Sequence, residues 1–122
     1  MKKSILIVDD SSSLRTAVRI ALLGAGYEVT EAEDGQAALA KLDGRKYHLV
    51  VSDVNMPRLD GIGFVTAMKQ MPAYKYTPVV MLTTESGQDK MANGKAAGAK
   101  AWMVKPFMPA QLLDVVSKLV LP

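Results

Sequence analysis

Short apolar stretches rich in β-branched residues alternate with segments of helical periodicity, and this alternation constrains the fold more than any other feature of the chain. The apolar stretches lie at residues 5–8, 27–32, 49–52, 79–82 and 101–104. Between them, apolar residues recur at three- and four-residue spacing, which predicts amphipathic helices. The sequence therefore predicts an α/β domain: a doubly wound (βα)5 unit with a five-stranded parallel sheet and helices on both faces.

Five helices are predicted from this periodicity and from capping residues. The first begins after the N-cap candidates Ser11–Ser13 and ends near Gly24. The other four cover residues 35–42, 64–71 and 86–98 and the chain from Pro109 onward. The fourth is expected to be weak, because three glycines lie in or beside it and each internal glycine costs about 1 kcal/mol relative to alanine.

The chain has 122 residues, the usual size of one domain, and no cysteine. Without cysteine, disulfides, thiolate zinc sites and cysteine nucleophiles are excluded. The first apolar run is too short for a signal peptide, and no run approaches the roughly 18 apolar residues that span a bilayer. We expect one cytoplasmic domain over residues 1–122, without membrane contact and without an output domain after the last helix.

The formal net charge is +3 and the sequence pI is near 9.2, but the basic residues are scattered. Because no Lys/Arg cluster predicts a nucleic-acid-binding face, we expect no direct contact with nucleic acid. His48 is the only histidine and begins the third strand, away from the acidic strand ends. A structural role is expected for it, and a histidine-based triad or multi-histidine metal site is excluded.

Polar residues end four of the predicted strands. Asp9 and Asp10 follow the first strand, Asp53 the third, Thr83 the fourth and Lys105 the fifth. The carboxyl ends of parallel strands lie along one edge of a sheet, where ligands bind. Each group alone has an ordinary explanation, such as helix capping or a turn, but together they predict one polar site.

Three neighbouring carboxylates repel one another, and a hard cation with oxygen ligands compensates for that repulsion. Mg²⁺ suits a site of one or two carboxylates, a carbonyl and waters. A lysine ammonium and a threonine hydroxyl would then stabilise a phosphoryl group, because phosphoryl transfer depends mostly on positioning and electrostatics. Asp53, at the centre, is the natural nucleophile and would form an acyl phosphate.

The chain resembles the receiver domain of bacterial two-component response regulators, most closely the single-domain chemotaxis regulators. The matching motifs span the chain; they are Ile7-Val8-Asp9-Asp10, Ser52-Asp53-Val54-Asn55-Met56-Pro57 with Asp60-Gly61, Leu82-Thr83-Thr84-Glu85 and Val104-Lys105-Pro106-Phe107. The resemblance implies a flavodoxin-like sheet with strand order 2-1-3-4-5.

The resemblance also implies roles for individual residues. Asp53 would be the phosphoacceptor. Asp10 and Asp53, with the backbone carbonyl of Asn55, would ligate Mg²⁺ or Mn²⁺, and Asp9 would help directly or through water. Lys105 would contact the phosphoryl group, and its bond to Pro106 would be cis.

Five positions concern switching and signal lifetime. Thr83 would turn toward the phosphoryl oxygen, and an aromatic residue on the fifth strand would then turn inward. That position is Trp102, where Tyr, Phe or His is more usual in the family. Asn55 and Glu85 would tune dephosphorylation, and the hydroxyl of Thr84, where the family often has Ala, would narrow access to the acceptor.

The function implied is a phosphorylation-activated switch of a chemotaxis-like phosphorelay. A chemotaxis-type histidine kinase would donate the phosphoryl group, the face formed by the fourth helix, fifth strand and fifth helix would change its partner binding, and autodephosphorylation would reset it. Candidate targets include a flagellar switch protein. The protein would be a monomer or a weak, phosphorylation-dependent dimer, and not an enzyme beyond its own phosphorylation and dephosphorylation.

An alternative is a small Mg²⁺-dependent phosphohydrolase with an aspartate nucleophile. Such enzymes usually carry Asp-x-Asp on the first strand and an inserted cap domain. Here the first strand ends in Asp9-Asp10, and the chain leaves no room for a cap.

Overall fold

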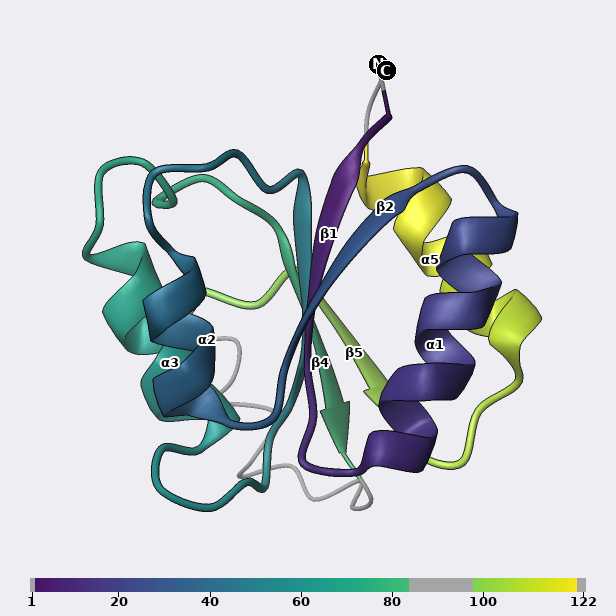
Figure 1. Cartoon of the computed structure of the whole chain (residues 1–122), viewed down its shortest axis with the longest axis horizontal. Helices are drawn as coiled ribbons and strands as arrows, with labels where there is room; N and C mark the ends of the chain where they lie inside the picture. Colours follow the sequence, from purple (N-terminus) through teal and green to yellow (C-terminus); the bar gives the residue numbers. More distant parts are fainter. Residues whose placement is uncertain (1, 84–97, 121–122) are drawn as a thin grey trace.

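The computed structural model describes residues 2–83 and 98–120, which form a five-stranded parallel sheet (Figure 1). The strand order is β2-β1-β3-β4-β5. The strands are β1 (Ser4–Val8), β2 (Glu28–Ala32), β3 (Leu49–Asp53), β4 (Val79–Thr83) and β5 (Ala101–Val104). The predicted fold class and strand order are thereby confirmed.

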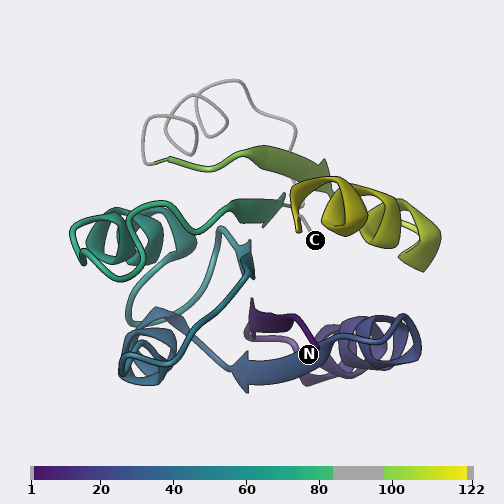
Figure 2. The same ribbon diagram turned by 90° about the horizontal axis from the view of Figure 1, so that it is seen from above.

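Four helices in the described part of the chain cover the two faces of the sheet. They are α1 (Ser12–Gly24), α2 (Gly35–Lys41), α3 (Gly61–Lys69) and α5 (Pro109–Leu119). Helices α1 and α5 lie on one face and α2 and α3 on the other (Figures 1 and 2). The helix predicted over residues 86–98 lies outside the described residues, except for its last position. None of the described helices is both long and apolar enough to cross a bilayer.

The central strands are buried because helices pack on both of their faces. Every residue of β3 and β4 is buried, as their continuous apolar sequences require of inner parallel strands. Alternate side chains of each strand enter two separate apolar clusters. Leu6, Val50 and Met81 pack with Phe64 of α3 in one cluster, whereas the other faces α1 and α5.

Helix α3 begins earlier than the sequence predicts. The expected span of residues 64–71 was wrong at both ends, because the helix runs from Gly61 to Lys69. Asp60 is the N-cap: its side-chain Oδ1 accepts a hydrogen bond from the Gly63 amide at 2.7 Å. The first turn, Gly61 to Gly63, holds two glycines and only one apolar residue, Ile62, so its helical signal is weak.

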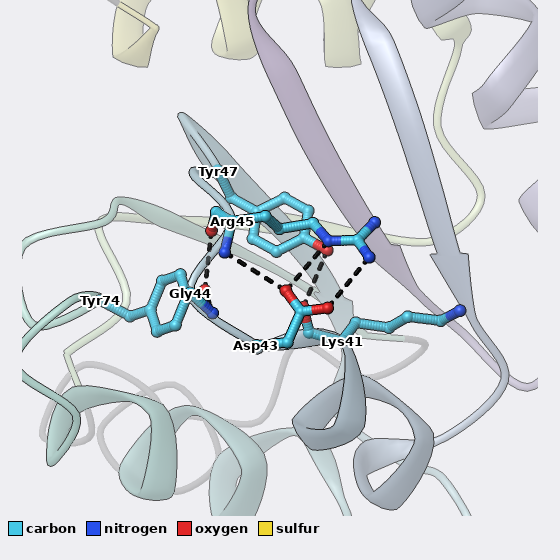
Figure 3. A network of polar contacts seen from close by, with 6 residues as sticks. All are labelled: Lys41, Asp43, Gly44, Arg45, Tyr47 and Tyr74. Carbon is cyan, nitrogen blue, oxygen red and sulfur yellow. Dashed lines mark hydrogen bonds and ion pairs between the residues drawn. The ribbon is translucent and has the colours of Figure 1, made fainter.

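At the amino ends of the strands, a polar network joins the α2–β3 and α3–β4 loops (Figure 3). The Tyr74 hydroxyl accepts a hydrogen bond from the Gly44 amide (2.9 Å) and donates one to the Arg45 carbonyl (2.7 Å). Arg45 also pairs with Asp43 through two side-chain nitrogens, each 3.0 Å from a carboxylate oxygen. This end of the sheet is thus closed by hydrogen bonds between its own loops.

Gly61 packs directly against the end of β3, and we expect Gly61→Ala to destabilise the fold. A Cβ at this position would collide with the Asp53 carbonyl oxygen, which is backbone and cannot move aside easily. We expect a loss of about 3 kcal/mol, the upper part of the range for overpacking, measured by urea unfolding. Gly24→Ala is the matched control, since a Cβ there meets no atom within 4 Å. Equal stability losses in the two variants would contradict this account.

Candidate functional site

The acidic residues at the carboxyl ends of β1 and β3 meet at one point. Asp9 and Asp10 directly follow β1, and Asp53 is the last residue of β3. One carboxylate oxygen from each of the three lies within 4.8 Å of the others. Asp9 and Asp53 are buried, whereas Asp10 is exposed, so the cluster is open to solvent on the Asp10 side.

Among the described residues, Lys105 is the base whose side chain pairs with the carboxylates of this cluster. Its Nζ lies 2.9 Å from Asp9 Oδ2 and 3.4 Å from Asp53 Oδ1. Its backbone amide donates to the Thr83 carbonyl at 2.6 Å. This hydrogen bond extends the pairing of β5 with β4 and holds the Lys105 backbone beside the end of β4. The peptide bond between Lys105 and Pro106 is cis.

Asp9 is held at both carboxylate oxygens. Oδ2 accepts from Lys105, and Oδ1 accepts a hydrogen bond from the Ser11 amide at 2.9 Å. The Asp9 carbonyl in turn accepts from the Arg15 guanidinium at 2.6 Å. With both oxygens engaged, Asp9 is less available as a direct cation ligand than Asp10, whose carboxylate is exposed.

Burial raises the pKa of Asp53, and the neighbouring Asp9 carboxylate raises it further. Lys105 opposes both effects but does not cancel them. One ammonium therefore leaves three carboxylates with an excess of negative charge. The three carboxylates offer hard oxygen ligands, and those of Asp10 are open to water. This donor set therefore fits a cation that prefers oxygen ligands.

Two further predicted residues lie near these strand ends. Thr83 is the buried last residue of β4, opposite Val104 of β5. Asn55 is exposed in the loop between β3 and α3. Thr84 and Glu85 lie outside the described residues. His48 lies at the other end of the sheet, where its Nδ1 accepts a hydrogen bond from the Ser4 amide at 3.0 Å.

Trp102 lies on the same face of the sheet as Thr83. It is opposite Met81 on the neighbouring strand, and Met81 and Thr83 are two residues apart, so their side chains share a face. The indole is half-buried against the apolar cluster of that face, and its Nε1 is buried without a hydrogen-bond partner among the described residues. A buried unpaired donor is costly, so a rearrangement that satisfied it would be favoured.

No sequence pattern identifies Arg15 as part of this site. Arg15 donates to the Asp9 carbonyl and pairs with Glu31 of β2 at 3.3 Å. Its position in α1 marks it only as a polar residue beside an apolar stripe. These contacts join α1 to the end of β1 and to β2, and the spacing of residues in the sequence does not predict them.

Comparison with known proteins assigns the family. The model of the response regulator receiver domain matches residues 5–117. The chain belongs to this family. It is 37% identical over 112 residues to chemotaxis protein CheY1 of Helicobacter pylori, covering 90% of each, and 34% identical to protein PilG of Pseudomonas aeruginosa, covering 92% of the chain and 83% of PilG.

Solved structures agree with this assignment. The structure of chemotaxis protein CheY4 of Vibrio cholerae matches with a TM-score of 0.94 and 45% identity, over 98% of this chain and 99% of that one. The receiver domain of the sensor kinase PA1611 of Pseudomonas aeruginosa matches with a TM-score of 0.90 and 26% identity, over 98% of both chains. Its active-site cleft coordinates a magnesium ion. The chain is therefore a receiver domain similar to CheY proteins, and such domains are phosphorylation-dependent signalling modules.

The charge balance of the cluster predicts that Asp53→Asn stabilises the receiver domain in EDTA at neutral pH. Because the folded-state pKa of Asp53 is raised, the ionised carboxylate opposes folding, and this penalty fades as the pH falls toward about 4. A gain of about 1 kcal/mol would raise the melting temperature by roughly 3–6 °C. The difference between variant and wild type should shrink in melts at decreasing pH.

Asp43→Asn is the control for this prediction. The hydrogen bond from Arg45 lowers the pKa of Asp43, so neutralising Asp43 removes a favourable charge and should not stabilise the fold. If both variants melted higher than wild type by the same amount, the effect would belong to surface charge in general and not to the cluster.

Proposed function

We propose that this receiver domain is a chemotaxis-type switch that accepts a phosphoryl group on Asp53 from a histidine kinase and loses it by hydrolysis. The observation that carries the proposal is the position of Lys105, whose Nζ lies within 3.4 Å of Asp53 and 2.9 Å of Asp9. A fixed ammonium beside a buried carboxylate is what an incoming phosphoryl group needs for charge stabilisation.

In the forward step, an Asp53 carboxylate oxygen attacks phosphorus and the phosphorus–nitrogen bond of the phosphohistidine breaks. The electron pair of that bond stays on the departing imidazole, and Asp53 carries an acyl phosphate. In the reset step, water attacks phosphorus, the bond to the Asp53 oxygen breaks, and carboxylate and inorganic phosphate are released. In the forward step, Lys105 exchanges its contact with Asp53 for one with a phosphoryl oxygen, and the reset step restores the contact with Asp53.

Asp10, Asp53 and the backbone carbonyl of Asn55 would hold Mg²⁺ or Mn²⁺ at this site, with Asp9 contributing through water. Bound there, the cation would neutralise charge on the phosphoryl oxygens. The support is the donor set itself: hard oxygen atoms with an excess of negative charge, and a related receiver domain whose cleft coordinates magnesium. Asp9 is assigned the indirect role because both of its oxygens already accept hydrogen bonds.

The switch proper would couple Thr83 to Trp102. Thr83 turns its hydroxyl to a phosphoryl oxygen, and space on its face of the sheet opens for the indole. The support for this coupling is that Trp102 and Thr83 share one face of the sheet on neighbouring strands. Thr84, Asn55 and Glu85 would set the lifetime of the acyl phosphate. Partner binding would change on the face that includes β5 and α5, and a flagellar switch protein is a candidate partner. The protein would act as a monomer or as a weak dimer when phosphorylated.

The phosphoacceptor is tested with acetyl phosphate and MgCl₂. We expect intact mass spectrometry to find one added phosphoryl group, labile to hydroxylamine, in the wild type and in Asp43→Asn, and none in Asp53→Asn or in EDTA. Labelling of Asp53→Asn at the wild-type level would overturn the assignment. Hydrolysis of many equivalents of p-nitrophenyl phosphate would instead identify a phosphohydrolase.

The coupling to Trp102 is tested by fluorescence, because Trp102 is the only tryptophan. We expect acetyl phosphate with MgCl₂ to change its emission in the wild type. Asp53→Asn should show no change, and Thr83→Ala should be phosphorylated with a smaller change. An unchanged emission in fully phosphorylated wild type would show that the indole does not respond.

A further inference from the structure

An ion pair joins the loop after the phosphoacceptor strand to the start of helix α2. The Nε of Arg58, in the β3–α3 loop, donates to Asp34 Oδ2 at 2.7 Å, and its Nη2 also pairs with that oxygen. Glu33 Oε1 lies 3.8 Å from the same Nη2. Both carboxylates belong to the turn between β2 and α2, so Arg58 bridges two segments that are far apart in sequence.

Asp34 is well suited to act as a fixed anchor. Its side chain is only 2% exposed, and its Oδ1 caps α2 by accepting from the Ala37 amide at 2.8 Å. The Ala37 hydrogen bond and the Arg58 guanidinium hold the pKa of Asp34 below its usual range, so it stays ionised at neutral pH. The Ala37 hydrogen bond already fixes the rotamer of Asp34. The ion pair with Arg58 therefore costs no further side-chain entropy at Asp34.

The backbone strengthens the same junction. The Gly35 amide donates to the Leu59 carbonyl at 3.1 Å, and a Cβ on Gly35 would collide with that oxygen. At the other end of the loop, the Val54 amide donates to the Leu82 carbonyl at 2.9 Å, which ties the loop to β4. Only residues 55–58, Arg58 included, lie between these two fixed points.

Arg58 adopts an unfavourable backbone conformation to make this contact. Its φ is +67°, and it is the only non-glycine residue with a positive φ in the described ranges. Glycine or asparagine would adopt that conformation at lower cost. The presence of arginine at this position is explained if its side chain contributes something that a glycine cannot.

We propose that the Arg58–Asp34 ion pair is a positioning clasp that holds residues 55–57 so that the Asn55 carbonyl faces the acidic cluster. Arg58 is not a catalytic residue, since it contacts neither the cluster nor Asp53; it acts through the loop. This inference rests on the proposed function, because the carbonyl matters only if the cluster takes up a cation and a phosphoryl group.

Arg58→Gly separates the clasp from the backbone strain. Glycine adopts the positive φ without steric strain, so the loop conformation remains accessible while the ion pair is lost. We expect the dissociation constant for Mg²⁺, measured by titration calorimetry with MgCl₂, to rise about tenfold, the lower end for a residue that orients a metal ligand. Arg58→Lys, which keeps one charged contact, should recover part of the affinity.

Two further measurements distinguish positioning from general destabilisation. Amide hydrogen exchange at residues 55–59 should become faster in Arg58→Gly, with exchange in β3 unchanged. Asp34→Asn keeps the cap on Ala37 but loses the charge, and its effect on Mg²⁺ affinity should not add to that of Arg58→Gly, because both remove one interaction.

Arg45→Ala is the matched control. It removes another Arg–Asp pair made through Nε and Nη2, the pair with Asp43 (Figure 3), which lies at the opposite end of the sheet. Its Mg²⁺ affinity should equal that of the wild type. If Arg58→Gly also bound Mg²⁺ within twofold of the wild type, the clasp would be refuted while the proposed function stood. If the wild type bound no Mg²⁺ and accepted no phosphoryl group, the proposed function would fail first.

Discussion

The contact of the Lys105 ammonium with Asp9 and Asp53 is the interaction on which the site depends. It joins the ends of β1, β3 and β5, which are not consecutive in sequence but lie in the same sheet. Without it, two buried carboxylates would face each other with no positive charge beside them, at a free-energy cost that the apolar core would have to offset. With it, the cluster still carries excess negative charge, so the free site favours the binding of a cation or a change of protonation.

The sequence predicts the sheet well, because inner parallel strands must be apolar on both faces and few other structures show that pattern. Residues 49–52 and 79–82 were placed correctly for this reason, and the polar residues that end the strands then follow from topology. The sequence does not predict the start of α3, because its first turn, Gly61 to Gly63, holds two glycines around one apolar residue, and its cap, Asp60, lies in a stretch typical of a loop.

Contacts between distant side chains could not be predicted from residue spacing. Asp34 and Arg58 are 24 residues apart. From the sequence alone, Asp34 is typical of a helix cap and Arg58 of a surface charge. Their pairing depends on the positive φ of Arg58 and on the approach of Leu59 to Gly35, which only the packed loops reveal. The partners of Asp9 are similar: a motif predicts an acid at the strand end but not which of its oxygens is occupied.

The two ends of the sheet differ in how completely their polar groups are satisfied. At the amino ends, the Tyr74 hydroxyl bonds backbone groups of the neighbouring loop, and the charges of Asp43 and Arg45 pair with each other. At the carboxyl ends, like charges are brought together, and the buried indole nitrogen of Trp102 has no hydrogen-bond partner in the part of the chain that the structure describes. A fold can carry such unfavourable groups only where surrounding structure holds them in place. The clasp at Arg58 and the pairing of Lys105 with the end of β4 supply that support, so the site can respond to a ligand without loosening the sheet beneath it.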